Sequence, residues 1–337
     1  MELEIKYNNF MGENINIRRQ SHIDSVAGLL IIHMILGHCI QVTDCRDLTL
    51  YKWMQVLSFF MPWFFFKSGM FLHSDCLKTI ESSLKSLILP LIKFSFLGLC
   101  IDICIELFDK QDFNLGQYLI DNVRFLFWNG SFSSNQPLWF LLTLGVVRIL
   151  GSYTLKISRK IGSIEQKVIF SLALLSLMIA YFLKGKIVPL TIQNSASGYF
   201  FFLMGYLLRD IQFKSLHGGA LSLILYLIIT FLCPVVVDMR GNSLEWGKYI
   251  LWPFSALTGI VAINYWFKKL NVNSKILSYI GERSLIFYVW HWIPLVIFQF
   301  LNNSYLLINE QIVLLFVYSI VSICFLFVVD KIYSFSK

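Results

Sequence analysis

Ten apolar stretches follow one another along the chain, joined by mostly short polar connections. They lie at 24–43, 53–73, 86–107, 137–155, 168–183, 187–208, 219–237, 249–267, 284–301 and 310–329. Most of them contain the roughly 20 residues that an α-helix needs to cross about 30 Å of hydrocarbon. The sequence therefore predicts an all-α, polytopic membrane protein with about ten transmembrane helices.

The amino-acid composition supports this class. Only 14% of the 337 residues are charged and 57% are hydrophobic, whereas about a quarter of the residues in a soluble domain are charged. In such a chain the net charge of +8 reports on membrane topology rather than on binding to nucleic acid. We therefore expect no nucleic-acid partner.

The distribution of lysine and arginine predicts the topology. With the N-terminus inside, the cytoplasmic segments contain 17 of these residues and the outer loops contain 8. Cytoplasmic loops carry the excess, so both termini are expected in the cytoplasm, which requires an even number of crossings. Residues 1–23 are expected to form a cytoplasmic tail without a cleavable signal peptide, and residues 24–333 a single integral-membrane domain.

No soluble catalytic domain interrupts this pattern. The longest connection, 108–136, is expected outside, and its segment QYLIDNVRFLFW has a polar and an aromatic side, as suits a helix in the membrane interface. The seven cysteines show no Cys-x-x-Cys or zinc-type spacing, so no metal site is expected. Any chemistry must come from residues in or beside the helices.

Three ionisable residues lie in or at the end of the first apolar stretch. Such groups are costly in hydrocarbon and mark pathways or reaction sites. Asp24 is expected at the cytoplasmic end, and His38 lies 14 residues on, about 21 Å along the axis and in the outer part of the membrane. His33 lies about 140° around the helix from His38. One histidine could therefore line a cavity while the other packs.

The spacing of Asp24, Gly28 and His38 resembles the first helix of acyltransferase family 3. Four further segments resemble that family's motifs in type and order. They are MPWFFFKSGMFL (61–72), QPLWFLLTL (136–144), SGYFFFLMGYLL (197–208) and IGERSLIFYVWHWIPL (280–295). The resemblance covers nearly the whole chain. It departs from the family at Ala27, where many members have Arg or Lys.

The resemblance implies an integral-membrane O-acyltransferase of the compact ten-helix type, in the bacterial plasma (inner) membrane. Members of the family move an acyl group, here expected to be acetyl, from cytoplasmic acyl-CoA to a hydroxyl group. The expected acceptor is a surface polysaccharide or its lipid-linked precursor. The implied partners are acyl-CoA, this glycan acceptor and membrane lipid, with no bound cofactor. Nothing in the sequence indicates an oligomeric state.

Transfer from a thioester to a hydroxyl requires a base, because a hydroxyl group is a poor nucleophile at neutral pH. Histidine titrates nearest that pH. The expected catalytic residues are Asp24, His38 and His291, with His291 near the middle of the membrane. His38 acts either as a general base in direct transfer or as the carrier of a transient acyl-imidazole. The sequence leaves both routes open.

Five polar residues map near the cytoplasmic side and are expected to contact the donor. They are Arg19, Lys67, Ser68, Arg283 and Ser284. Arginine and lysine suit the phosphates of CoA. The arginines could instead be only the positively charged anchors of cytoplasmic loops.

Three residues near the outer side are candidates for the acceptor. Asp102 and Glu106 are four apart on one face of the third helix and could bind sugar hydroxyls or simply be solvated at the helix end. Trp139 could stack on a sugar ring or anchor the helix at the membrane interface.

Two other classes of protein fit the hydropathy pattern. A polytopic transporter or lipid-linked glycan flippase would also have a few buried charges, but the sequence shows no inverted repeat and no paired helix breaks. A non-catalytic membrane assembly subunit is the third class. Turnover of labelled acetyl-CoA separates an acyltransferase from both, because neither of them hydrolyses or transfers the acyl group.

Overall fold

The computed structural model describes residues 20–45, 50, 54–109, 113–183, 185–186, 188–232, 239 and 246–335. All regular structure within these ranges is helical, which confirms the all-α class. Arg19 and the tail before it lie outside the described residues, so their predicted roles stay predictions.

Each of the ten apolar stretches contains a helix. The helices are α2 (Ser21–Val42), α4 (Phe60–Met70), α5 (Cys76–Ser83), α6 (Leu89–Asp109), α7 (Leu115–Asn129), α8 (Trp139–Ser158), α9 (Glu165–Phe182), α10 (Ile192–Leu208), α11 (Leu216–Leu232), α12 (Trp246–Lys269), α13 (Lys275–Glu282), α14 (Ser284–Trp290), α15 (Trp292–Leu301) and α16 (Gln311–Phe335). Short helical turns join some of them, among them η1 (Leu84–Ile88), which continues α5 into α6, and η2 (Ser133–Leu138) before α8.

Five helical segments of the described chain are long and apolar enough to cross a membrane. They are Ser21–Val42, Cys76–Phe108, Leu115–Phe182, Ser284–Leu306 and Gln311–Ile332, and Leu216–Leu232 is a shorter apolar helix. This supports an integral, multi-pass membrane protein. The ten predicted crossings stay a prediction. Five segments of the described chain meet the length requirement, and one of them, Leu115–Phe182, is a run of several helices.

The second helix is shorter than the apolar stretch 53–73. Residues 56–59 form turns, and α4 begins only at Phe60. Pro62 lies in the first turn of α4, where its missing N–H costs nothing because the first N–H groups of a helix have no partner within it. A helix that continued from residue 53 would lose the bond from position 62 to the carbonyl of Ser58.

The stretch 284–301 is also divided. It forms α14 and α15, which meet at His291. Pro294 lies in the first turn of α15 and cannot bond to the carbonyl of Trp290, which weakens the helix at this point. The division places His291 at a helix junction.

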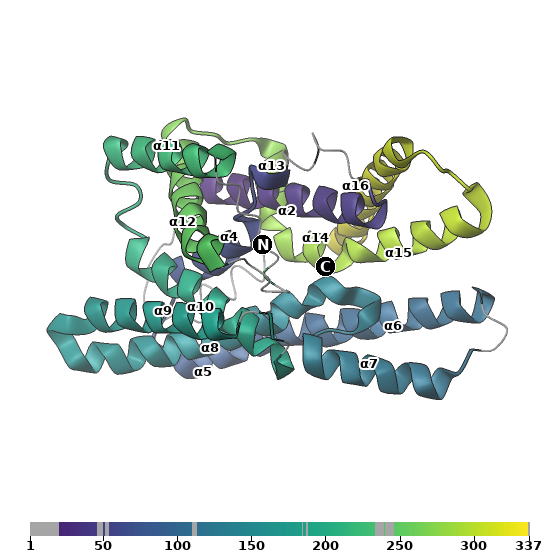
Figure 1. Cartoon of the computed structure of the whole chain (residues 1–337), viewed down its shortest axis with the longest axis horizontal. Coiled ribbons are helices and arrows are strands. Elements are labelled where there is room, and N and C mark those ends of the chain that lie inside the picture. The colour runs from purple at the N-terminus through teal and green to yellow at the C-terminus, as the bar shows by residue number, and fades with distance from the viewer. Residues whose placement is uncertain are drawn as a thin grey trace.

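Helix α2 is central to the bundle. It contacts α4, α12, α13, α14, α15 and α16, and Figure 1 shows it running along the long axis of the molecule, as α6 and α8 also do. Its buried residues are spread over all its sides, from Ile23 to Cys39. A helix enclosed in this way holds its polar side chains against neighbouring helices rather than against lipid.

Two glycines let α2 and α13 touch through their backbones. A Cβ at Gly28 would lie 2.0 Å from the carbonyl oxygen of Leu277, and one at Gly281 would lie 1.8 Å from that of Asp24. Small residues permit such close approach between helices in membranes. The first and last motifs of the sequence therefore meet at this contact.

A second glycine pair joins α4 to α10. A Cβ at Gly69 would lie 1.8 Å from the carbonyl oxygen of Phe202, and one at Gly205 would lie 2.1 Å from that of Phe66. Gly69 and Gly205, from two other sequence motifs, thus serve the same purpose, and they bring α4, which carries Lys67, into a fixed position beside α10.

Candidate active site

Two histidines far apart in the sequence lie face to face. His38 comes from the second half of α2 and His291 from the junction of α14 and α15. Their ring centroids are 5.1 Å apart with an interplanar angle of 27°. Trp292 packs edge-on against His38, with the ring centroids 5.3 Å apart. The structure thus brings together two of the three residues predicted to be catalytic.

The His291 ring is completely buried. Its Nδ1 lies 2.5 Å from the carbonyl oxygen of Tyr288. A carbonyl oxygen can only accept a hydrogen bond, so Nδ1 carries the proton, and in the neutral ring Nε2 holds the lone pair. This Nε2 is buried without a hydrogen-bond partner in the described chain.

His38 is the more accessible of the two, since its side chain is only partly buried. Its Nδ1 lies 3.3 Å from Oε1 of Gln41, one turn further along α2. When the amide oxygen accepts this bond, Nε2 is the basic nitrogen of the neutral ring. An accessible imidazole can accept a proton from a hydroxyl group or attack a carbonyl carbon.

The histidine pair is joined to the segment before α8. The Tyr288 hydroxyl donates a hydrogen bond to the carbonyl of Pro137 in η2, and the Tyr288 ring packs edge-on against Phe140 with centroids 5.5 Å apart. Trp139, between these two contacts, is 7% exposed. The structure places Trp139 in the protein core near the site, and a sugar would need an opening there to reach its ring.

The other end of α2 carries a charged pair. Asp24 is buried, and its Oδ1 lies 3.9 Å from Nζ of Lys67 on α4. The same ammonium group lies 5.4 Å from the centre of the Trp63 ring. At position 27, where many family members have Arg or Lys, this chain has the completely buried Ala27. The cation beside Asp24 is instead Lys67 of the neighbouring helix. Asp24 lies about 21 Å along α2 from His38, and the structure does not bring these two predicted catalytic residues together.

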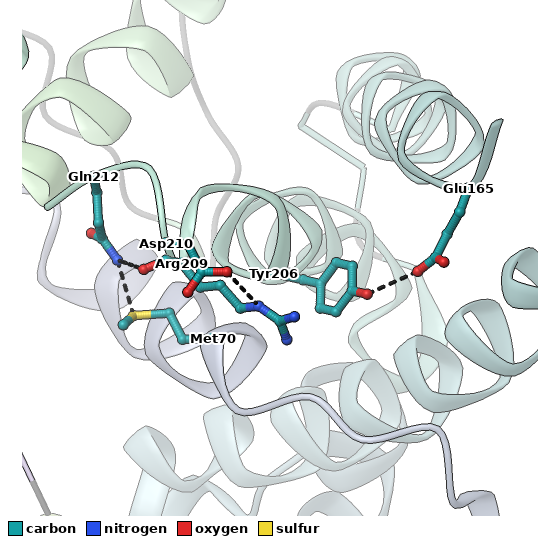
Figure 2. A network of polar contacts seen from close by, with 6 residues as sticks. All are labelled: Met70, Glu165, Tyr206, Arg209, Asp210 and Gln212. Atoms are coloured by element: carbon teal, nitrogen blue, oxygen red, sulfur yellow. Dashed lines mark hydrogen bonds and ion pairs between the residues drawn. The ribbon is translucent and has the colours of Figure 1, made fainter. Parts of the chain in front are cut away.

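Buried polar groups continue from this charged pair into the protein. Trp63 donates from Nε1 to Oδ1 of Asn264 over 2.8 Å, and Asn264 donates from Nδ2 to Oε1 of Gln212 over 3.0 Å. Nε2 of Gln212 lies 3.5 Å from Sδ of Met70, a contact that Figure 2 marks with a dashed line. The sequence analysis missed Asn264 and Gln212. Asn264 could have been found from the sequence as an amide side chain within an apolar helix, because such a side chain requires a hydrogen-bond partner on another helix.

Arg283 is held by a carboxylate that the sequence analysis also missed. Its Nε lies 3.0 Å from Oδ1 of Asp330 on α16, and Asp330 is almost completely buried. The Tyr279 hydroxyl donates to the same carboxylate, and the guanidinium carbon lies 4.1 Å from the Tyr279 ring centre. These contacts make Arg283 a bridge between α13 and α16. Ser284, at the start of α14, is partly exposed.

The remaining predicted residues lie on other helices. Asp102 on α6 accepts a hydrogen bond from the Tyr118 hydroxyl on α7, so it joins these two helices. Glu106 lies one turn further along α6 and is partly buried, and Ser68 is partly exposed on α4 beside Lys67. A sugar that used Asp102 would share that carboxylate with Tyr118.

A cavity of about 540 Å³ lies near the charged end of α2. It is lined by Gln20, Met70, Phe71, Arg209, Asp210, Phe213, Lys214 and Lys268. Figure 2 shows the Arg209 side chain between those of Asp210 and Tyr206. Its Nε lies 3.4 Å from the Asp210 carboxylate. The Tyr206 hydroxyl donates to Glu165 over 2.8 Å. No group of histidine, cysteine and carboxylate side chains in the described chain is arranged to hold a metal ion.

Comparison with known proteins identifies the family. The family model of an acyltransferase domain matches residues 21–331, which is nearly the whole chain. No curated protein and no solved structure matches. The matched range contains both glycine contacts, the charged pair on α2 and the histidine pair. The chain therefore belongs to acyltransferase family 3.

Proposed function

We propose that the protein is an O-acyltransferase, with acetyl as the acyl group. In this proposal ten helices cross the bacterial inner membrane and both termini are cytoplasmic. The donor is acyl-CoA, and the acceptor is a hydroxyl group of a surface polysaccharide or of its lipid-linked precursor. The stacked pair of His38 and His291 is the observation that carries the proposal, because it places an accessible imidazole inside the bundle of an acyltransferase.

In the direct route, Nε2 of His38 accepts the proton of the acceptor hydroxyl while the oxygen attacks the thioester carbonyl. The tetrahedral intermediate then expels the CoA thiolate, which takes the proton from the His38 imidazolium. The products are an ester and free CoA. General base assistance of this kind contributes about 10²–10⁴-fold.

In the relay route, Nε2 of His38 attacks the thioester first. CoA leaves as the thiolate, and the acylated ring keeps its Nδ1 proton. The acceptor hydroxyl then attacks the acyl group, its proton passes to the thiolate, and the ring returns to its neutral form. His291 packs against His38 in both routes and holds its ring in place. Asp24, 21 Å away by helix rise, serves the donor end through its pair with Lys67.

The test is turnover of radiolabelled acetyl-CoA by purified protein in lipid nanodiscs. The wild-type chain is expected to release CoA and to transfer or hydrolyse the acetyl group, and His38→Gln, whose amide cannot titrate, is expected to be inactive. His217→Gln is the matched control, since His217 is exposed on α11 and is expected to keep full activity.

Two results would contradict the proposal. A folded wild-type protein that neither hydrolyses nor transfers the acetyl group would favour a transporter or an assembly subunit. A folded His38→Gln variant with near wild-type turnover would remove the catalytic role of His38. Thermal unfolding must first show that the variant is as stable as the wild type.

A further inference from the structure

The cavity at the charged end of α2 has an excess of positive charge. Arg209, Lys214 and Lys268 line it together with a single carboxylate, Asp210. Arg209 meets Asp210 through Nε, and in Figure 2 its two terminal nitrogens point away from that carboxylate. A guanidinium group held in this way can still present its terminal N–H groups to the oxygens of a phosphate.

The rest of the cavity wall is apolar and partly aromatic. Met70, Phe71 and Phe213 line it, and Nζ of Lys268 lies 4.2 Å from the centre of the Phe213 ring. His22 packs edge-on against the same ring, with centroids 5.6 Å apart, and its Nε2 is buried without a hydrogen-bond partner in the described chain. Cations next to flat apolar surfaces suit a ligand that combines phosphates with an aromatic ring.

The position of the cavity restricts the shape of such a ligand. Met70 lies one turn beyond Lys67 on α4, so the cavity adjoins the Asp24–Lys67 pair. From His22, which packs against the lining residue Phe213, to His38 is about 24 Å along α2. A ligand anchored in the cavity that reacts at His38 must therefore have an anionic head and a long neutral arm.

We propose that this cavity binds the phosphorylated adenosine end of the acyl-CoA donor. Arg209, Lys214 and Lys268 contact its phosphates, and the adenine ring packs against Phe71 and Phe213. The pantetheine arm extends past the Asp24–Lys67 pair toward the histidines. This assignment rests on the proposed function and adds three cationic residues that the sequence analysis did not select. The assignment is also consistent with the contacts of Arg283. This residue was expected to bind the donor, but it forms an ion pair with Asp330 on α16.

The first experiment measures binding of 3′,5′-ADP to the purified full chain by calorimetry. This nucleotide keeps the 3′-phosphate and one of the two 5′-phosphates of CoA but has no arm and no thioester, so its binding does not depend on transfer. Lys268→Ala and Arg209→Ala are each expected to weaken binding about tenfold, as loss of one charged hydrogen bond does. Lys269→Ala, at the neighbouring exposed lysine of α12, is the matched control and is expected to bind as the wild type does.

The second experiment compares donors in the transfer assay. Lys268→Ala is expected to raise KM for acetyl-CoA about tenfold with little change in kcat, and to leave kcat/KM for S-acetyl-pantetheine, which lacks the nucleotide, unchanged. Such a split would not follow from a general loss of structure.

The assignment is overturned if both cavity variants bind 3′,5′-ADP as tightly as the wild type, or if Lys269→Ala weakens binding equally. Either result leaves the acyltransferase function intact if the wild type still transfers acetyl groups. A wild-type chain that binds 3′,5′-ADP through these residues but transfers nothing overturns the proposed function instead, and with it the identification of the ligand as a donor.

Discussion

Gly281→Ala tests whether the backbone contact between α2 and α13 supports the site. The added Cβ would lie 1.8 Å from the carbonyl oxygen of Asp24 and 2.9 Å from the amide nitrogen of Gly28. Since real Cβ atoms do not approach other atoms within 3.0 Å, the two helices must separate by about 1.2 Å. Both of these atoms belong to the backbone, so no side-chain rotation can relieve the clash.

The expected cost follows from this displacement. Overpacking of a tight core costs about 1–3 kcal/mol, and the better helix propensity of alanine offsets up to about 1 kcal/mol of it. Activity should fall more steeply than stability. Helix α13 leads directly into α14 and on to His291, and a misplacement near 1 Å can reduce a rate about 100-fold.

The assay combines thermal unfolding, followed by circular dichroism, with acetyl-CoA turnover. Gly218→Ala is the matched control, because Gly218 also lies in a helix but a Cβ there would be 3.5 Å from its nearest neighbour. The control should be as stable as the wild type or slightly more so. If Gly281→Ala unfolds at the same temperature as Gly218→Ala and keeps its turnover, the reasoning from the helix contact is refuted.

Three further substitutions probe single contacts. Lys67→Ala should raise KM for acyl-CoA more than it lowers kcat, because it removes binding shared by the ground and transition states; unchanged KM would make Lys67 a purely structural partner of Asp24. His33→Phe should keep most of the turnover, since His33 is buried edge-on to an aromatic ring 5.5 Å away, and loss of activity in a folded variant would contradict a packing role. Asp330→Asn should lower the free energy of unfolding by up to about 3 kcal/mol, because it breaks a buried ion pair with Arg283; an unchanged denaturation midpoint would show that this pair adds nothing.

The sequence predicted the positions of the long apolar helices because one physical requirement fixes the length of a membrane-spanning segment. A segment that spans hydrocarbon must be helical and apolar over about 20 residues whatever its neighbours are. The stretch 24–43 accordingly matches α2 to within a few residues. Ionisable groups in apolar helices are rare, but it was the resemblance to the family's motifs that selected His38 and His291, and the structure places their rings together.

The partners of the buried polar groups could not be predicted in this way. Hydropathy reports which segments avoid water, but not which side chain of another helix a polar group will meet. The pairing of Arg283 with Asp330 and the bond from Trp63 to Asn264 each join segments far apart in sequence. The late start of α4 was visible in principle, since Pro62 restricts how a helix can pass through it.

Helix α2 sets a fixed length within the molecule. The Asp24–Lys67 pair and His38 lie at opposite ends of one continuous helix, so their separation of about 21 Å is a multiple of the helix rise and no loop movement can change it. In the proposed reaction the length of α2 therefore fixes the distance that the arm of the acyl carrier must cover. The thioester of a carrier with a shorter arm would not reach His38, and a carrier with a longer arm would have to fold back on itself to place its thioester there. The protein would therefore select its donor by the length of the carrier arm as well as by the chemistry of the acyl group. Lengthening α2 by one turn would increase the required arm length by about 5 Å.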